Sequence, residues 1–85
     1  MKPDEIHVYN NRGFAYAKLG QIQLAIEDFK ETILLKPDDA NGYHNRGLAY
    51  FLQGNNNLGC HDAQMACALG DCKLLEKSKE KGFCR

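Results

Sequence analysis

Four cysteines are the residues with the most distinctive chemistry in this sequence. They are Cys60, Cys67, Cys72 and Cys84, all in the last third of the chain. Four cysteines can pair as disulfides in three ways, stay reduced as small buried hydrophobic residues, or contribute ligands to a metal site. We expect two disulfides, and we keep reduced thiols and a metal site as alternatives.

The neighbours of Cys60 raise the questions of metal binding and catalysis. Cys60, His61, Cys67 and Cys72 are zinc-compatible ligand types, but the sequence has no Cys-x2-Cys pair. Consecutive helical residues point about 100° apart, so Cys60 and His61 do not share an ion or act as nucleophile and base. A glycine-rich phosphate-binding loop is also missing from the sequence. We therefore predict no metal, no cofactor and no enzymatic activity.

The elements that position these residues come from an internal repeat. A shift of 34 residues superimposes two segments of the chain, beginning with "NNRG" on "HNRG". The superimposed positions include identical aromatic, asparagine, arginine, glycine and aspartate residues. They are Tyr9 and Tyr43, Asn11 and Asn45, Arg12 and Arg46, Gly13 and Gly47, Tyr16 and Tyr50, Gly20 and Gly54, and Asp28 and Asp62.

Apolar residues follow helical spacing within each unit, with a break at Gly20 and Gln21. The segment Pro37-Asp38-Asp39 closes the first unit and offers a cap to the helix that follows. Because glycine costs roughly 1 kcal/mol in a helix interior, we attribute Gly13 and Gly47 to close helix crossings. The predicted helices span about residues 5–19, 22–35, 40–53 and 56–69, and a polar helix with apolar Leu74 and Leu75 follows at about 72–82.

These residues resemble the tetratricopeptide repeat family. Its signature is met by Tyr9, Gly13, Tyr16, Ala25, Phe29 and Pro37, with Arg12 in place of the usual leucine. The second unit departs from it, because Gly59, Ala63 and Asp71 replace the alanine, phenylalanine and proline. The resemblance implies an all-α fold of antiparallel helix-turn-helix repeats with about five helices. We expect one domain over residues 1–85, with repeats at about 6–39 and 40–71 and a capping helix at about 72–82.

The predicted helices also constrain the pairing of the cysteines. If residues 56–69 and 72–82 form an antiparallel hairpin, Cys60 lies opposite Cys84 and Cys67 lies near Cys72. This nested pairing would join the last helix to the second repeat.

The resemblance implies a protein-binding scaffold whose groove is lined by the first helix of each repeat. A terminal-carboxylate clamp is incomplete, because Phe14 and Leu48 replace asparagines and Lys18 is the single cation at these positions. We expect a mixed apolar and amide surface, with contacts to a neighbouring helix as the alternative for Phe14, Leu48 and Phe51. The predicted groove residues are His7, Asn10, Asn11, Phe14, Lys18, Asn41, His44, Asn45, Leu48 and Phe51.

Arg12 and Arg46 have two interpretations. They could present fork-shaped donors to a carboxylate or phosphate ligand. We favour a structural role in which each pairs locally or lies across an aromatic ring, and in which it joins one repeat to the next.

Charge and length limit the classes of partner. Eleven basic residues balance eleven acidic ones, which argues against nucleic acid, and no apolar run is long enough for membrane insertion. We expect a soluble protein, cytoplasmic if the cysteines are reduced and periplasmic or secreted if they are disulfide-bonded. Repeat arrays usually need about three units. A homodimer formed by stacking, or by helix exchange through residues 53–59, is therefore the alternative function.

Overall fold

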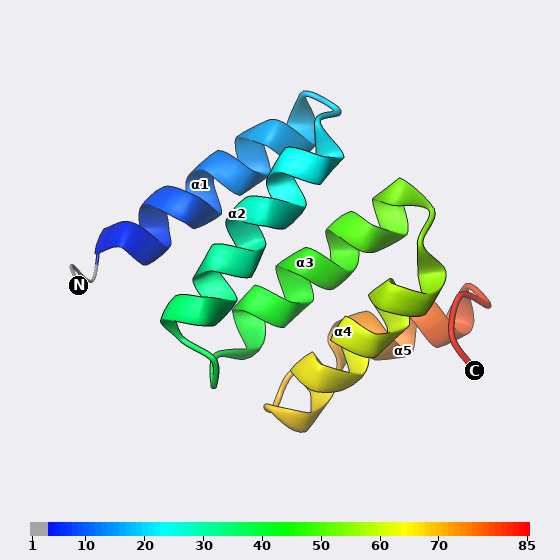
Figure 1. Ribbon diagram of the computed structural model, residues 1–85. Helices are drawn as coiled ribbons and strands as arrows, with labels where there is room; N and C mark the ends of the chain where they lie inside the picture. Colours follow the sequence, from blue (N-terminus) through cyan, green and yellow to red (C-terminus); the bar gives the residue numbers. More distant parts are fainter. Residues whose placement is uncertain (1–3) are drawn as a thin grey trace.

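The protein is an array of antiparallel helices. The computed structural model describes residues 4–85, so residues 1–3 of the predicted domain lie outside the described residues. Figure 1 shows α1 and α2 as one hairpin, α3 and α4 as a second, and α5 beside α4. Within the described residues the helices are α1 (Asp4–Lys18), α2 (Ile22–Leu35), α3 (Ala40–Gln53), α4 (Asn56–Ala68) and α5 (Lys73–Glu80). The predicted all-α fold is confirmed, and we propose that the two hairpins and α5 are the predicted repeats and capping helix.

The helix ends follow from capping residues. Asp39 begins α3, where its side chain accepts a hydrogen bond from the backbone N–H of Asn41 at 3.0 Å. Gly54 ends α3 with φ of 88°, a left-handed conformation that costs glycine little. Asn55 then begins α4 by accepting a hydrogen bond from the backbone N–H of Leu58. The α5 helix is shorter than the predicted 72–82, because residues 81–83 form turns.

We expect Asp39→Ala to lower the free energy of unfolding by about 1 kcal/mol, because the first turn of α3 loses its side-chain acceptor. Urea denaturation followed by circular dichroism measures this loss. Asp38→Ala is the matched control, because the side chain of Asp38 is exposed and one position away. An equal effect of the two substitutions would show that capping by Asp39 does not set the start of α3.

The core of the first hairpin is built around Phe29. This ring is 2 % exposed and lies in a cluster with Ala25, Ile26 and Ala49. A Cβ atom at Gly13 would stand 2.6 Å from Cε1 of Phe29, closer than real side chains approach. Gly13 therefore permits α1 and α2 to cross closely, as the sequence predicts.

The second hairpin fills the same space with different side chains. Gly59 and Ala63 stand where the first hairpin has Ala25 and Phe29. The ring of Phe51 packs at Gly59, where an added Cβ would meet it at 2.7 Å. Leu74 of α5 covers Gly47 and is 6 % exposed. The α5 helix thus completes the core of the second hairpin as well as covering its end.

Candidate functional site

Each repeated arginine forms a bidentate pair with an aspartate of the next helix. Nε and Nη2 of Arg12 donate to Asp28 at 2.9 and 2.8 Å, and the same atoms of Arg46 donate to Asp62 at 2.8 and 2.9 Å. The aspartates are 4 % and 1 % exposed. Each pair joins the two helices of one hairpin. The prediction that the arginines join one repeat to the next was wrong, because their partners are the aspartates of the same repeat.

Two tyrosines flank each guanidinium. The Cζ atom of Arg12 lies 5.6 and 5.9 Å from the ring centroids of Tyr9 and Tyr16, and Tyr43 and Tyr50 flank Arg46 at 5.7 and 5.8 Å. Hydrogen bonding to the aspartate raises the pKa of both arginines above the usual value. Each guanidinium group therefore contacts one carboxylate and two aromatic rings of its own chain, which supports the structural role.

The two pairs differ in exposure. The side chain of Arg12 is 53 % exposed and that of Arg46 is 19 % exposed. The α3 helix packs between α2 and α4, whereas α1 lies at the edge of the array beside α2 (Figure 1). The pair in the second hairpin is therefore the better shielded from water, and its loss is expected to cost more.

A hollow of about 480 Å³ lies between α3 and α5. Leu48 and Leu74 give it an apolar surface, and charged side chains of α5 form its rim. The lining residues are His44, Leu48, Lys73, Leu74, Glu76, Lys77 and Glu80. We call this hollow the α3–α5 groove. Apolar surface with a few polar groups around it is typical of ligand-binding sites in general.

The structure brings some of the predicted groove residues together. His44 and Leu48 line the α3–α5 groove. Nδ2 of Asn45 donates a hydrogen bond to Oδ1 of Asn10 at 3.4 Å, which links α1 to α3. Of the remaining polar residues, His7, Asn11, Lys18 and Asn41 are exposed and line no part of this groove.

The two predicted aromatic groove residues contact other aromatic rings of the chain. Phe14 meets Phe29 edge to face, with ring centroids 5.3 Å apart. Phe51 stacks on Phe83, with centroids 5.5 Å apart and an angle of 27° between the rings. For Phe14 and Phe51 the structure therefore favours the alternative interpretation, in which they pack against neighbouring parts of the chain.

The α5 wall of the groove was missed by the sequence prediction. Lys73, Glu76, Lys77 and Glu80 recur at helical spacing and share one face of α5. This helical spacing of charged residues was the signal in the sequence that could have located the α5 wall. These residues were predicted only as part of a capping helix. A helix that follows the last repeat occupies the position that the first helix of another repeat would have, so it also faces the groove.

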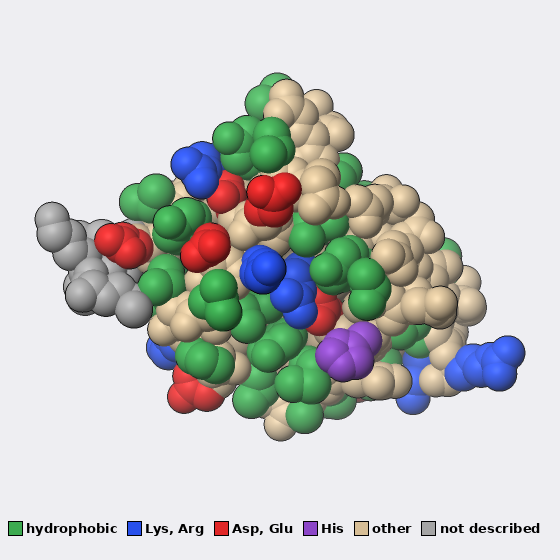
Figure 2. All heavy atoms as spheres, in the orientation of Figure 1, with side chains coloured by type: hydrophobic (Ala, Val, Ile, Leu, Met, Phe, Trp, Pro, Cys, Tyr) green, Lys and Arg blue, Asp and Glu red, His purple; other side chains and the backbone are tan. Residues whose placement is uncertain are grey.

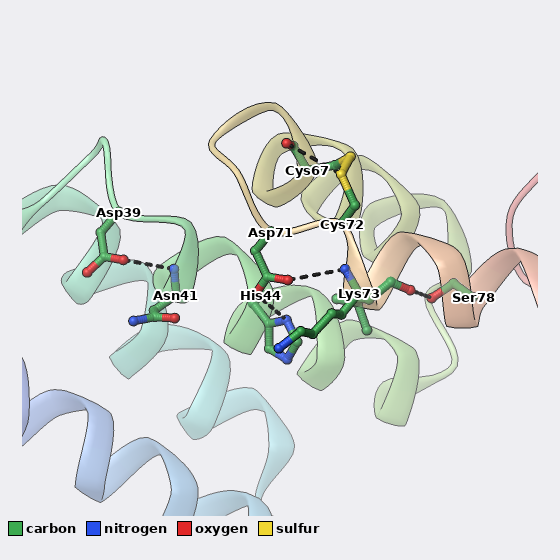
Figure 3. A network of polar contacts seen from close by, with 9 residues as sticks. Asp39, Asn41, His44, Cys67, Asp71, Cys72, Lys73 and Ser78 are labelled. Carbon is green, nitrogen blue, oxygen red and sulfur yellow. Dashed lines mark hydrogen bonds and ion pairs between the residues drawn. A yellow bond between two sulfur atoms is a disulfide. The ribbon is translucent and has the colours of Figure 1, made fainter.

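His44 also connects α3 to the turn before α5. Its Nδ1 lies 3.5 Å from Oδ2 of Asp71, whose Oδ1 accepts a hydrogen bond from the backbone N–H of Lys73 at 3.1 Å (Figure 3). Asp71 therefore fixes the start of α5 and meets a groove residue of α3.

All four cysteines are paired in the structure. One disulfide joins Cys60 to Cys84, with Cα atoms 5.7 Å apart, and the other joins Cys67 to Cys72. These are the two predicted pairs. Among the described residues, no three His, Cys, Asp or Glu side chains are grouped so that they could hold a metal ion.

The arrangement of helical hairpins defines a helical-repeat protein. Comparison with known families identifies the repeat, because the family described as "TPR repeat" matches residues 15–54. Residues 15–54 match this repeat, which confirms over these residues the resemblance found in the sequence. Such repeats generally mediate protein–protein interaction and are typically non-enzymatic scaffolds. A comparison with curated proteins found no match.

Among the helices of residues 4–85, none combines the length and apolar character that a membrane span requires.

Proposed function

We propose that this protein binds a peptide or a partner helix in the α3–α5 groove. The observation that carries the proposal is the hollow between α3 and α5, in which Leu48 and Leu74 offer apolar surface beside the charged residues of α5. Leu48 is 42 % exposed although it belongs to a packed array, so it can bury further surface against a ligand.

The chemistry of the groove favours an apolar side chain flanked by polar residues in the ligand. Lys73 and Lys77 alternate with Glu76 and Glu80 along the rim, so the rim has no net charge. A ligand selected by bulk charge does not fit this pattern. An amphipathic segment fits it, because one apolar side chain can contact Leu48 while its neighbours meet the rim.

The face of the molecule on which α4 lies in front of α5 carries a different mixture of side chains from the α3–α5 groove. Figure 2 shows that acidic and basic side chains lie close together over α1 and α2 on this face, and that hydrophobic side chains are spread over much of it. Dispersed apolar residues are normal on a solvent-facing surface.

The proposal is tested with a peptide selected from a random phage-displayed library against the oxidised protein. We expect Leu48→Glu to weaken binding of that peptide by about 10-fold or more, because a buried apolar contact is lost and a carboxylate enters the groove. Isothermal titration calorimetry measures the dissociation constants.

Leu34→Glu is the matched control for this experiment. Leu34 is 62 % exposed on α2 and does not line the groove. Its substitution is expected to leave the affinity unchanged. If both variants bind the peptide as tightly as the unchanged protein, the α3–α5 groove is not the binding site.

Self-association through α1 is a second candidate function. Val8 of α1 and Leu19 in the turn after α1 are 58 % and 71 % exposed. One repeat later, the counterpart of Val8 is Gly42, which packs against Ile33 of α2. A second chain could cover the corresponding face of α1. Sedimentation equilibrium tests this candidate, because it predicts a dimer mass that Val8→Glu reduces to that of one chain. A one-chain mass at millimolar concentration contradicts it.

A further inference from the structure

The α5 helix has few contacts of its own that hold it in place. It has eight residues, and isolated helices of this length are marginal in water. Two of its side chains, Leu74 and Ser78, are buried. The hydroxyl of Ser78 donates to the backbone carbonyl of Leu74 within α5, so it does not join α5 to another helix. Leu74 is therefore the main apolar anchor of α5.

The two disulfides compensate for this weak anchoring. Cys67–Cys72 joins α4 to the residue before α5, and Cys60–Cys84 joins α4 to the segment after it. Each end of α5 is thus linked covalently to α4. A crosslink limits the conformations available to the released chain, and so it favours the docked position of α5.

The C-terminal segment, residues 81–85, is held by the same crosslink. Its Phe83 and Cys84 backbone N–H groups donate to the carbonyl of Ser78 at 2.9 and 3.3 Å. The ring of Phe83 stacks on Phe51, and Cys84 is 9 % exposed. The Cys60–Cys84 disulfide therefore keeps both this segment and the end of α5 against the second hairpin.

We infer that the α3–α5 groove is controlled by the redox state of these cysteines, so that it is complete in the oxidised protein and loses its α5 wall on reduction. The inference rests on the proposed function, since the wall in question is that of the proposed binding site. A dithiol reductant supplies two electrons and two protons to each disulfide. The sulfur–sulfur bond breaks, two thiols form, and the dithiol becomes a disulfide itself.

Limited trypsin digestion tests the release of α5 without any ligand. Lys73, Lys77 and Lys79 lie in α5, while Lys18 in α1 and Lys30 in α2 are exposed internal controls in the same chain. Proteolysis follows the population of the open form when opening is fast. We expect an excess of dithiol to speed cleavage after the α5 lysines by about 10-fold or more. Cleavage after the control lysines should change by less than about 2-fold.

Two outcomes of the digestion overturn the inference. Unchanged cleavage of α5 in the reduced protein means that the disulfides do not hold the wall. An equal acceleration at all lysines means that reduction opens the whole fold and that no local control exists. The double variant Cys60→Ser and Cys84→Ser, digested without reductant, should reproduce the selective cleavage, and its failure to do so contradicts the role of this disulfide.

The library-selected peptide separates this inference from the proposed function. If the peptide binds the oxidised protein about 10-fold more tightly than the reduced protein, the redox control is supported. If α5 stays protected on reduction while Leu48→Glu still weakens binding, the inference fails and the proposed function stands. If α5 is released and the peptide binds both forms equally, the α5 wall is not part of the binding site and both fail.

Discussion

Replacing Leu74 with alanine is expected to lower the free energy of unfolding by about 3 kcal/mol. Leu74 is 6 % exposed, and one of its methyl groups covers Gly47 in α3. The second hairpin has Ala63 at the position where the first has Phe29, so no large aromatic side chain of α4 can fill the cavity that the substitution leaves. Urea denaturation of the oxidised protein, followed by circular dichroism, measures the effect.

Leu75→Ala is the matched control for the Leu74 variant. Leu75 is the next residue of α5 and is half-buried, so its truncation removes less buried surface. We expect it to cost about 1 kcal/mol. Equal losses for the two variants would contradict the conclusion that Leu74 completes the core of the second hairpin.

Removal of the Arg46 guanidinium is the second change with a large expected effect. Arg46→Ala leaves the carboxylate of Asp62, which is 1 % exposed, without its bidentate partner. Breaking a buried ion pair costs about 3 to 5 kcal/mol. Because Arg46 is 19 % exposed and water can reach its site, we expect a loss of about 2 to 3 kcal/mol.

The repeat supplies the control for Arg46. Arg12→Ala removes the same kind of pair, but Arg12 is 53 % exposed, so its loss is expected to be the smaller. The double variant Arg46→Ala and Asp62→Asn removes the carboxylate as well as the guanidinium, so no uncompensated buried charge is left. This variant should lose less stability than the sum of the two single changes. Additive losses would mean that the two side chains do not stabilise the fold as a pair.

The helices and the glycine contacts could be predicted because both depend on residues close together in the repeat. The 34-residue period and the segment Pro37-Asp38-Asp39 located the helices, and the close crossing at Gly13 followed from a glycine placed inside a helix. The disulfide pairs followed from the antiparallel course of α4 and α5, since a hairpin brings residues together in nested order.

The arginine partners could also have been found in the sequence. Asp28 and Asp62 recur with the same period as Arg12 and Arg46. An acidic residue that repeats together with a basic one in the next helix indicates a pair. The prediction instead assigned the arginines to the boundary between repeats.

The groove could be predicted only in part. Helical periodicity places His44 and Leu48 on one face of α3, but it does not say which distant side chain fills a gap in the core. Gly59 and Ala63 indicate in the sequence that α4 has no large side chain to fill the core of the second hairpin. Phe51 and Leu74 fill this space instead, and their positions depend on tertiary packing. For the same reason the sequence did not reveal that Phe83 covers the ring of Phe51.

The most direct test of the central claim is an NMR titration of the oxidised, ¹⁵N-labelled protein with the library-selected peptide. The account predicts that amide shift changes concentrate in the groove-lining segments of α3 and α5, including His44, Leu48, Lys73 and Lys77. Changes confined to the exposed surfaces of α2 and α4, with the amides of α3 and α5 unaffected, would contradict the claim that the α3–α5 groove binds the peptide.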